Sequence, residues 1–189
     1  MNLDLTFTID SLLDGCKQGE REAQENLYRT LAPRMMAVCM RYAKDSYEAE
    51  DMLQNGFVKV FNKVSEFRSE GSFEGWIRRI MVNTAIETYR KNLRTLSVVD
   101  IDEVYDQPQS TFDMNQLETK DLMKLVQQLS NGYRMVFNMY VIEGYSHKEI
   151  SESLGITEGA SKSQLSRARA ILKDKILKIE GSNYGTYAG

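Results

Sequence analysis

Apolar side chains recur at steps of three and four residues along most of the chain, which is the spacing of one face of an α-helix. Alternation of apolar and polar residues, the pattern of a half-buried strand, is scarce. The period breaks before Pro33, where we expect a new helix to begin, because proline suits the first helical position. It continues across Asn55 and Gly56, so this pair is interpreted as a weak point in a helix, costing about 1 kcal/mol, and not as a hairpin turn. The pattern predicts an all-α fold.

The strongest local signals lie between residues 144 and 172 and predict two helices joined by a tight turn. Ser146 can cap the first helix, and Glu149 three residues later completes a capping box. Gly155 can adopt the left-handed conformation that ends a helix, and Thr157 can cap the second helix. This arrangement is a helix-turn-helix. The second helix is expected to run to residue 179, with a buried face of Leu165, Ala168, Leu172, Ile176 and Ile179.

Polar side chains occupy the remaining surface of that second helix. Arg167 can bind guanine through two donors, Gln164 can pair with adenine, and serine or lysine can hold phosphate. A basic helix that only faces solvent would show the same residue types. The paired caps and the short first helix favour DNA recognition over that simpler interpretation. The candidate residues are Lys162, Ser163, Gln164, Ser166 and Arg167.

A second candidate surface lies between residues 65 and 91. The stretch 65–75 is rich in Ser, Gly and charge but contains two phenylalanines, and aromatic side chains in such a loop can stack on bases. Ser72 is expected to cap a helix that begins near Phe73. A single tryptophan is most often a core residue. Because arginines lie near Trp76, the pattern is at least as consistent with a position at the rim of an interface. This face of the helix carries Trp76, Arg79, Asn83, Ile86 and Arg90.

The net charge of -3 is unevenly distributed along the chain. Residues 1–91 carry 13 basic and 14 acidic side chains, residues 92–121 carry 2 and 7, and residues 122–178 carry 9 and 5. The C-terminal segment is therefore basic and the middle is acidic. Because few counterions would be released on binding, we expect the chain alone to bind duplex DNA poorly at physiological salt and to need a larger partner.

Helical periodicity fails between residues 95 and 119, where acidic side chains and Pro108 occur. A stretch this long without a period is typical of a flexible connector. Its charge suits a solubilising tether, which the sequence favours, or a segment that occupies a basic channel of a partner. Further amphipathic helices are expected over 117–129 and 133–141. The expected organisation is two small helical domains, 1–94 and 120–180, a flexible acidic linker, 95–119, and a disordered tail, 181–189.

Composition excludes several other classes. The sequence has no long apolar run and no signal-peptide pattern, so we expect a cytoplasmic protein without membrane insertion. Cys16 and Cys39 form no CxxC pair, and His147 is the single histidine, so no metal or other cofactor is expected. An enzyme of the helical phosphohydrolase kind would need clustered His and Asp ligands. We expect His147 to act as a structural cap or to contact phosphate, and not to act as a base.

Four blocks together resemble the extracytoplasmic-function (ECF) group of bacterial sigma factors, in the sigma-70 class. Any one block, especially the last, occurs in other proteins, but their order and spacing around a variable acidic linker are specific. The resemblance spans roughly residues 10 to 178. The blocks are EAEDMLQNGFVKVF at 48–61, FRSEGSFEGW at 67–76, WIRRIMVNTAIETYRK at 76–91 and YRMVFNMYVIEGYSHKEISESLGITEGASKSQLSRARAIL at 133–172.

The resemblance implies a non-enzymatic subunit that gives core RNA polymerase its promoter specificity, with no small-molecule substrate. One domain would bind core polymerase and the melted -10 element, the other the -35 element as duplex, while the linker threads through the product channel of the polymerase. An anti-sigma factor is a further expected partner. The implied residues are Asp51, Gln54, Asn55 and, packed beneath them, Phe57 for the polymerase; Phe67, Arg68, Ser72, Phe73, Trp76, Arg79, Asn83 and Arg90 for the -10 element; and Lys148, Ser161, Lys162, Ser163, Gln164 and Arg167 for the -35 element.

Three positions depart from the pattern of that family. Asn55 stands where an acidic residue is usual, and Glu87 replaces an aspartate, which keeps the charge at a longer reach. Ser130 replaces a proline and can still cap the helix that follows.

An alternative is a stand-alone regulator that binds an operator through the same helix-turn-helix, with its first ninety or so residues dimerising or sensing a ligand. It predicts tight promoter binding without polymerase, and it gives no role to Asp51, to Gln54 or to the polar face within residues 76–91.

Overall fold

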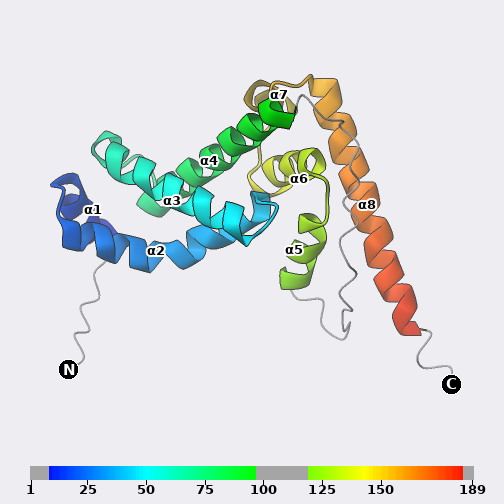
Figure 1. Ribbon diagram of the computed structural model, residues 1–189, viewed down its shortest axis with the longest axis horizontal. Helices are drawn as coiled ribbons and strands as arrows, with labels where there is room; N and C mark the ends of the chain where they lie inside the picture. The colour runs from blue at the N-terminus through cyan, green and yellow to red at the C-terminus, as the bar shows by residue number, and fades with distance from the viewer. Residues whose placement is uncertain (1–8, 97–118, 185–189) are drawn as a thin grey trace. The chain divides into compact units, whose positions relative to one another are not determined.

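The computed structural model describes residues 9–96 and 119–184, and every regular element within these ranges is helical (Figure 1). The predicted all-α fold is confirmed. Packing divides the chain into two compact units, Met1–Thr88 and Tyr89–Gly189. Residues 97–118, which make up most of the predicted linker, lie outside the described residues, and so do residues 185–189 of the predicted tail. The predicted domain limits therefore stay predictions.

The first unit is built from four helices and one short turn of 3-10 helix. The helix α2 packs along both α1 and α3, and their apolar stripes meet those of α4 in one core. The most deeply buried side chains include Leu27, Leu31, Met35, Val60, Ile77 and Met81. The elements are α1 (Ile9–Lys17), α2 (Arg21–Tyr42), α3 (Ser46–Lys63), the 3-10 turn (Val64–Glu66) and α4 (Phe73–Leu96), whose residues from Tyr89 onward belong to the second unit.

The helix α2 continues through Pro33, so the predicted break is wrong. A proline inside a helix removes one backbone donor and clashes with the preceding turn, at a cost of about 3 kcal/mol. Leu31 and Met35, on either side of it, are buried in the same core. Burial of both side chains offsets that cost, because it requires the helix to stay in register across the proline.

The helix α3 continues through Asn55 and Gly56, as predicted. Gly56 is nevertheless more than a weak point, because it is buried where α3 meets α4. A Cβ atom at this position would overlap Sδ of Met81. The absence of a side chain at Gly56 therefore lets the two helices approach closely.

Both cysteine thiols are reduced and buried in the first unit. Burial raises the pKa of the Cys39 thiol to about 12. The pKa of Cys16 is also raised, first by burial and then by the nearby Glu20 carboxylate. Neither thiol is in the thiolate form near neutral pH, so these side chains act as small apolar core residues.

The second unit is built around α8, which packs against α5, α6 and α7. The predicted helices at 117–129 and 133–141 are present with somewhat different bounds. The helix α8 extends beyond the predicted end and into the predicted tail, because an established helix gains one backbone hydrogen bond for each residue added. The elements are α5 (Thr119–Gln127), α6 (Asn131–Phe137), a π-helical turn that continues it (Asn138–Ile142), α7 (His147–Leu154) and α8 (Glu158–Tyr184).

The core of this unit joins α5 to the middle of α8. Tyr133, Phe137, Ile171, Ile176 and Ile179 surround it as partly buried side chains, so four of the five residues predicted on the buried face of α8 contribute to this core. The fifth, Leu165, is also buried. The core cluster is Leu125, Val126, Leu129, Ala168 and Leu172.

The corner between α5 and α6 is closed by a buried cation that sequence reasoning missed. Arg134 is 3% exposed, and its guanidinium donates to the carbonyl oxygens of Gln127 at 2.8 Å and Leu129 at 3.4 Å. It also donates to the side-chain oxygen of Asn131. Carbonyls at a helix C-terminus lack intrahelical donors, and a cation there suits the helix dipole. Arg134 therefore caps α5, while Ser130 occupies the N-cap position of α6 without a side-chain hydrogen bond.

Candidate polymerase and nucleic-acid interfaces

The exposed side of α3 carries the residues expected to contact a protein partner. The helix starts at an N-cap, where Oδ1 of Asp45 accepts from the backbone N–H of Glu48 at 2.8 Å. Asp51, Gln54 and Asn55 are all exposed, as expected. Phe57 lies beneath them, 2% exposed, with its ring edge-on to Tyr28 at 4.7 Å between centroids. Phe57 thus supports this surface from inside the core and cannot touch a partner directly.

Two large apolar side chains on α3 are exposed as well, and the sequence analysis did not single them out. Tyr47 is 79% exposed and Val58 is 58% exposed. Val58 follows Gln54 by four residues, so the two lie on one face of the helix. We call Asp51, Gln54, Asn55 and Val58 the α3 surface. Its mixture of polar and apolar groups is typical of a protein–protein contact.

A polar surface with two arginines runs along α4. The helix begins at Phe73, and Oγ of Ser72 accepts from the backbone N–H of Gly75 at 3.1 Å, so the predicted cap is confirmed. Arg79, Asn83 and Arg90 are exposed, while Trp76 is half-buried at the edge of the core and Ile86 is buried within it. We call Trp76, Arg79, Asn83 and Arg90 the α4 surface. These side chains can hydrogen-bond to bases and neutralise phosphates.

Phe67 and Phe73 were expected to stack on bases, and the structure corrects this expectation. They are 7% and 2% exposed, and their ring centroids lie 5.1 Å apart. Trp76 completes the cluster, at 5.5 Å from Phe67 and 5.8 Å from Phe73. The rings are buried against one another, so neither phenylalanine presents a face to a base. Their role is to close the loop onto the start of α4.

The loop between Phe67 and α4 uses two left-handed backbone conformations. Ser69 has a φ of 59° and Gly71 a φ of 106°. For a residue with a Cβ atom, this conformation costs roughly 1 kcal/mol, so the packed aromatic cluster must hold Ser69 in place. Arg68 and Ser72 are exposed on this loop.

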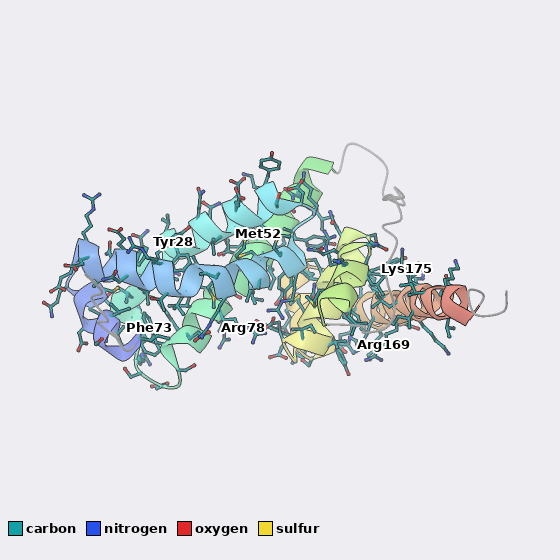
Figure 2. The ribbon with its side chains drawn as sticks, turned by 90° about the horizontal axis from the view of Figure 1, so that it is seen from below. Tyr28, Met52, Phe73, Arg78, Arg169 and Lys175 are labelled. Carbon is teal, nitrogen blue, oxygen red and sulfur yellow. The ribbon has the colours of Figure 1, made fainter. Side chains whose placement is uncertain are left out.

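A pocket lies beside this loop at the N-terminus of α4. Arg78, on α4, contributes to this pocket (Figure 2). It follows Glu74 by four residues, so both lie on one side of α4. Sequence reasoning missed Arg78 because it lies off the stripe that contains Trp76. Unpaired backbone N–H groups at a helix N-terminus favour acceptors and anions. The lining residues are Ile9, Gly71, Ser72, Phe73, Glu74, Gly75 and Arg78.

Ion pairs between helices hold the α4 surface in place. Nζ of Lys59, on α3, contacts the carboxylate of Glu87 and lies 3.2 Å from Oγ1 of Thr84. Arg34, on α2, pairs with Glu74 at 2.9 Å. Glu87, noted in the sequence as a charge with a longer reach, therefore links α4 to α3.

The helix-turn-helix is present with the predicted caps. The hydroxyl of Ser146 accepts from the backbone N–H of Glu149 at 3.2 Å, and the Glu149 carboxylate accepts from the backbone N–H of Ser146 at 2.8 Å. Gly155 has a φ of 70° at the end of α7. Oγ1 of Thr157 accepts from the backbone N–H of Ala160 at 3.0 Å. These local bonds fix where α7 ends and α8 begins.

Most of the side chains expected to face DNA are exposed on this motif. Lys162, Ser163 and Arg167 are exposed on α8, Lys148 is exposed on α7, and Gln164 is half-buried. We call these five residues, four on α8 and one on α7, the α8 surface. Three of the five carry a positive charge, which suits a phosphate-lined groove.

Ser161 was expected to face DNA as well, and the structure corrects this. It is 0% exposed, and its Oγ lies 2.9 Å from Nδ1 of His147. The reason is helical spacing, because Ser161 precedes Leu165 by four residues and Ala168 by seven, on the buried stripe of α8. The structural cap expected at His147 is wrong, because Ser146 caps α7 and His147 bonds instead to a side chain of α8.

No helix among residues 9–96 and 119–184 is long and apolar enough to cross a membrane. Within the part of the chain that the structure describes, no group of three or more His, Cys, Asp or Glu side chains is placed to hold a metal ion.

The fold and its exposed surfaces define an all-helical protein with a helix-turn-helix in its second unit. Family models match both units: residues 27–95 match the model described as Sigma-70 region 2, and residues 119–172 match the model described as Sigma-70, region 4. The chain belongs to the sigma-70 family of RNA polymerase sigma factors, in its ECF group.

Curated relatives and a solved structure show similar matches. The chain is 29% identical over 168 residues to the ECF RNA polymerase sigma factor SigE of Mycolicibacterium smegmatis. This match covers 85% of this chain but only 64% of that relative. It is 25% identical over 182 residues to the ECF RNA polymerase sigma-E factor of Haemophilus influenzae, covering 90% and 96%. The sigma factor RpoE of Bartonella quintana, solved in complex with the anti-sigma factor NepR, shares 24% identity over 82% of this chain and 96% of that one, with a TM-score of 0.48.

Proposed function

We propose that this protein binds core RNA polymerase and directs it to promoters, recognising the -35 element as duplex and the -10 element as melted single strand. One observation supports the proposal most strongly. A single chain carries both the α8 surface, on a helix-turn-helix, and the α4 surface, beside a loop that is held by packed aromatic rings. The polymerase would supply the catalysis, so the protein acts as a binding subunit and not as an enzyme.

The α8 surface suits the major groove of duplex DNA. Arg167 can donate two hydrogen bonds to guanine, and Gln164 can pair with adenine after its half-buried side chain turns outward. The exposed Lys148 and Lys162 can bind backbone phosphates. Base contacts would therefore come from α8, and the lysines would supply most of the phosphate contacts that position the protein on the DNA.

The α4 surface and the loop before it suit unpaired DNA. With Phe67 and Phe73 buried, the groups left to hold an extruded base are those of the pocket and its rim, namely Arg68, Ser72 and Arg78. Asn83 and Arg79 lie farther along the helix, where they can contact adjacent nucleotides. Hydrogen bonds to the extruded base would offset an unstacking cost of a few kcal/mol. Melting then follows from binding and needs no nucleotide hydrolysis.

The α3 surface is the proposed contact with core polymerase. Asp51 and Gln54 supply charge and hydrogen bonds, and Val58 supplies apolar area next to them. Interfaces of this composition gain specificity from the polar pairs, because an unmatched partner leaves a charge unpaired. An anti-sigma factor is a further proposed partner, and the exposed apolar side chains Tyr47, Val58 and Leu177 are the groups that it could cover.

Transcription from a genomic fragment library with purified bacterial core polymerase, with and without this protein, tests the proposal. Mapping of the transcript starts should show new starts that share two spaced upstream motifs. The absence of new starts, together with a specific shift of duplex DNA by the protein alone, would overturn the proposal in favour of a stand-alone regulator.

A further inference from the structure

A buried hydrogen bond joins the two helices of the helix-turn-helix. Ser161 lies in the first turns of α8 and His147 is the first residue of α7, fourteen positions earlier in the chain. The bond of 2.9 Å between Ser161 Oγ and His147 Nδ1 spans the turn at Gly155. A hydroxyl buried without a partner costs a few kcal/mol, so the bond to His147 favours the packing that keeps this histidine opposite Ser161.

The same histidine is held on its other side by the π-helical turn. The ring of His147 stacks on the ring of Tyr140, with centroids 4.5 Å apart and planes at 24°. Arg169 lies on α8 (Figure 2). Its guanidinium is 5.8 Å from the centroid of the Tyr140 ring. One row of side chains therefore connects α8, α7 and the π-helical turn. Turns of π-helix are rare and recur at functional sites.

We propose that His147 is a positioning residue for DNA recognition, because its bond to Ser161 and its stack on Tyr140 fix the orientation of the α8 surface. This inference rests on the proposed function. Ser161 directly precedes Lys162 and Ser163, and Gln164 follows within one helical turn. Any rotation of α8 about its axis would move these three side chains together relative to the groove.

Packing alone does not require this pair. An apolar side chain at position 161 would fill the same buried stripe as Leu165 and Ala168 without needing a partner. A hydrogen bond adds direction that apolar contacts lack, because it is strong only over a narrow range of angles. The pair therefore selects one orientation among the several that a smooth apolar contact between α7 and α8 would permit.

Three variants separate positioning from packing. Ser161→Val removes the hydroxyl and puts two methyl groups in its place, with an increase in side-chain volume of about one methyl group. His147→Phe keeps an aromatic ring on Tyr140 and removes the Nδ1 group, whereas His147→Asn keeps a polar atom near the position of Nδ1 and removes the ring. Ser151→Ala is the matched control, because its hydroxyl donates only to the carbonyl of Lys148 within the same helix, at 2.7 Å.

The transcription assay above supplies the measurement. Full-length parent and variants are assembled with core polymerase and run on the same genomic library, at a temperature where circular dichroism shows each protein folded. Ser161→Val and His147→Phe should lower the enrichment of starts that carry the upstream motif by about 3- to 10-fold, the loss expected from one hydrogen bond. His147→Asn should recover part of this loss, and Ser151→Ala should match the parent.

The state of the bond in solution is read from the histidine itself. Because the chain has one histidine, the ring nitrogen signals of His147 are assigned without ambiguity. The Nδ1 signal should shift in Ser161→Val and stay in place in Ser151→Ala. This readout reports the bond whether or not the promoter assay responds.

The outcomes separate this inference from the proposed function. If the parent yields no new starts, the proposed function fails. If the parent yields both motifs and the folded Ser161→Val and His147→Phe proteins keep the same upstream preference, the positioning role is overturned while the proposed function stands. Should Ser161→Val fail to fold, His147→Phe and His147→Asn still decide the question.

Discussion

Replacement of Arg134 by alanine should strongly destabilise the second unit. The guanidinium makes two good hydrogen bonds, to the Gln127 carbonyl at 2.8 Å and to the Asn131 side chain, and a weaker one to Leu129 at 3.4 Å. A hydrogen bond from a charged donor contributes about 1.5–3 kcal/mol. The alanine variant also avoids the cost of burying a cation, which offsets part of the loss of these hydrogen bonds. We therefore expect the free energy of unfolding of the second unit to fall by about 3–5 kcal/mol. A small domain has little more stability than this in total.

The position of the single tryptophan lets the two units be monitored separately. Trp76 lies in the first unit, so its fluorescence reports unfolding of that unit, while far-ultraviolet circular dichroism reports helices in both. In urea titrations of Arg134→Ala, the tryptophan transition should coincide with that of the parent. The dichroism signal should lose helix at much lower urea concentration, because the second unit unfolds first.

Two controls define how this prediction would fail. Arg134→Lys keeps the charge but offers a compact ammonium group that cannot span the same acceptors, so it should fall between parent and alanine variant. Lys173→Ala, an exposed change on α8 in the same unit, should have no measurable effect. A dichroism transition for Arg134→Ala within about 0.5 kcal/mol of the parent, the usual range for surface substitutions, would refute the capping role of Arg134.

Three further predictions follow from the surfaces and the core. Arg167→Ala should weaken initiation that depends on the upstream motif by about 1–3 kcal/mol in a competitive transcription assay, and unchanged promoter preference would remove Arg167 from base recognition. Asp51→Ala should lower affinity for core polymerase in gel filtration or titration without altering the Trp76 unfolding transition. Glu50→Ala, which removes the adjacent exposed acid, should leave that affinity unchanged. Equal binding of the Asp51 variant and the parent would refute the role of Asp51. Cys39 has its pKa raised by burial from 9.0 to about 12, so in this pH range the unfolded chain loses a proton that the folded chain keeps. Stability of the first unit should therefore fall as pH rises from about 9 towards 12, by at most about 1.4 kcal/mol per pH unit, and Cys39→Ala should flatten this slope; an unchanged slope would show that other groups cause it.

The features that sequence predicted best are those set by local chemistry. The caps at Ser146, Gly155 and Thr157 depend on residues within three or four positions of one another, so their meaning does not change with the rest of the fold. The same holds for Ser72 at the start of α4. The exposed stripe of Arg79, Asn83 and Arg90 follows from helical spacing alone.

Most of the corrected expectations concern tertiary contacts. Phe67 and Phe73 were assigned to base stacking because an aromatic loop looks exposed in sequence, whereas the two rings and Trp76 bury one another. Pro33 is tolerated because the core on either side holds α2 in register. The close approach at Gly56 depends on Met81, a residue on another helix.

Ser161 is the one case in which a signal was available and was missed. Its spacing to Leu165 and Ala168 places it on the buried stripe, but its polar character and its position in the family pattern favoured an outward role. Arg134 gave no such signal, because a buried arginine is uncommon and only the corner between α5 and α6 explains it.

The most direct test of the central claim compares two forms of DNA. Once a promoter has been mapped, holoenzyme binding is measured by anisotropy to two probes, one with the upstream element as duplex and one with the downstream element as an unpaired non-template strand. Arg167→Ala should weaken binding to the duplex probe alone, and Asn83→Ala binding to the single-stranded probe alone. Equal loss on both probes for either variant, or tighter binding of the downstream element as duplex, would contradict recognition of opposite forms of DNA by the two units.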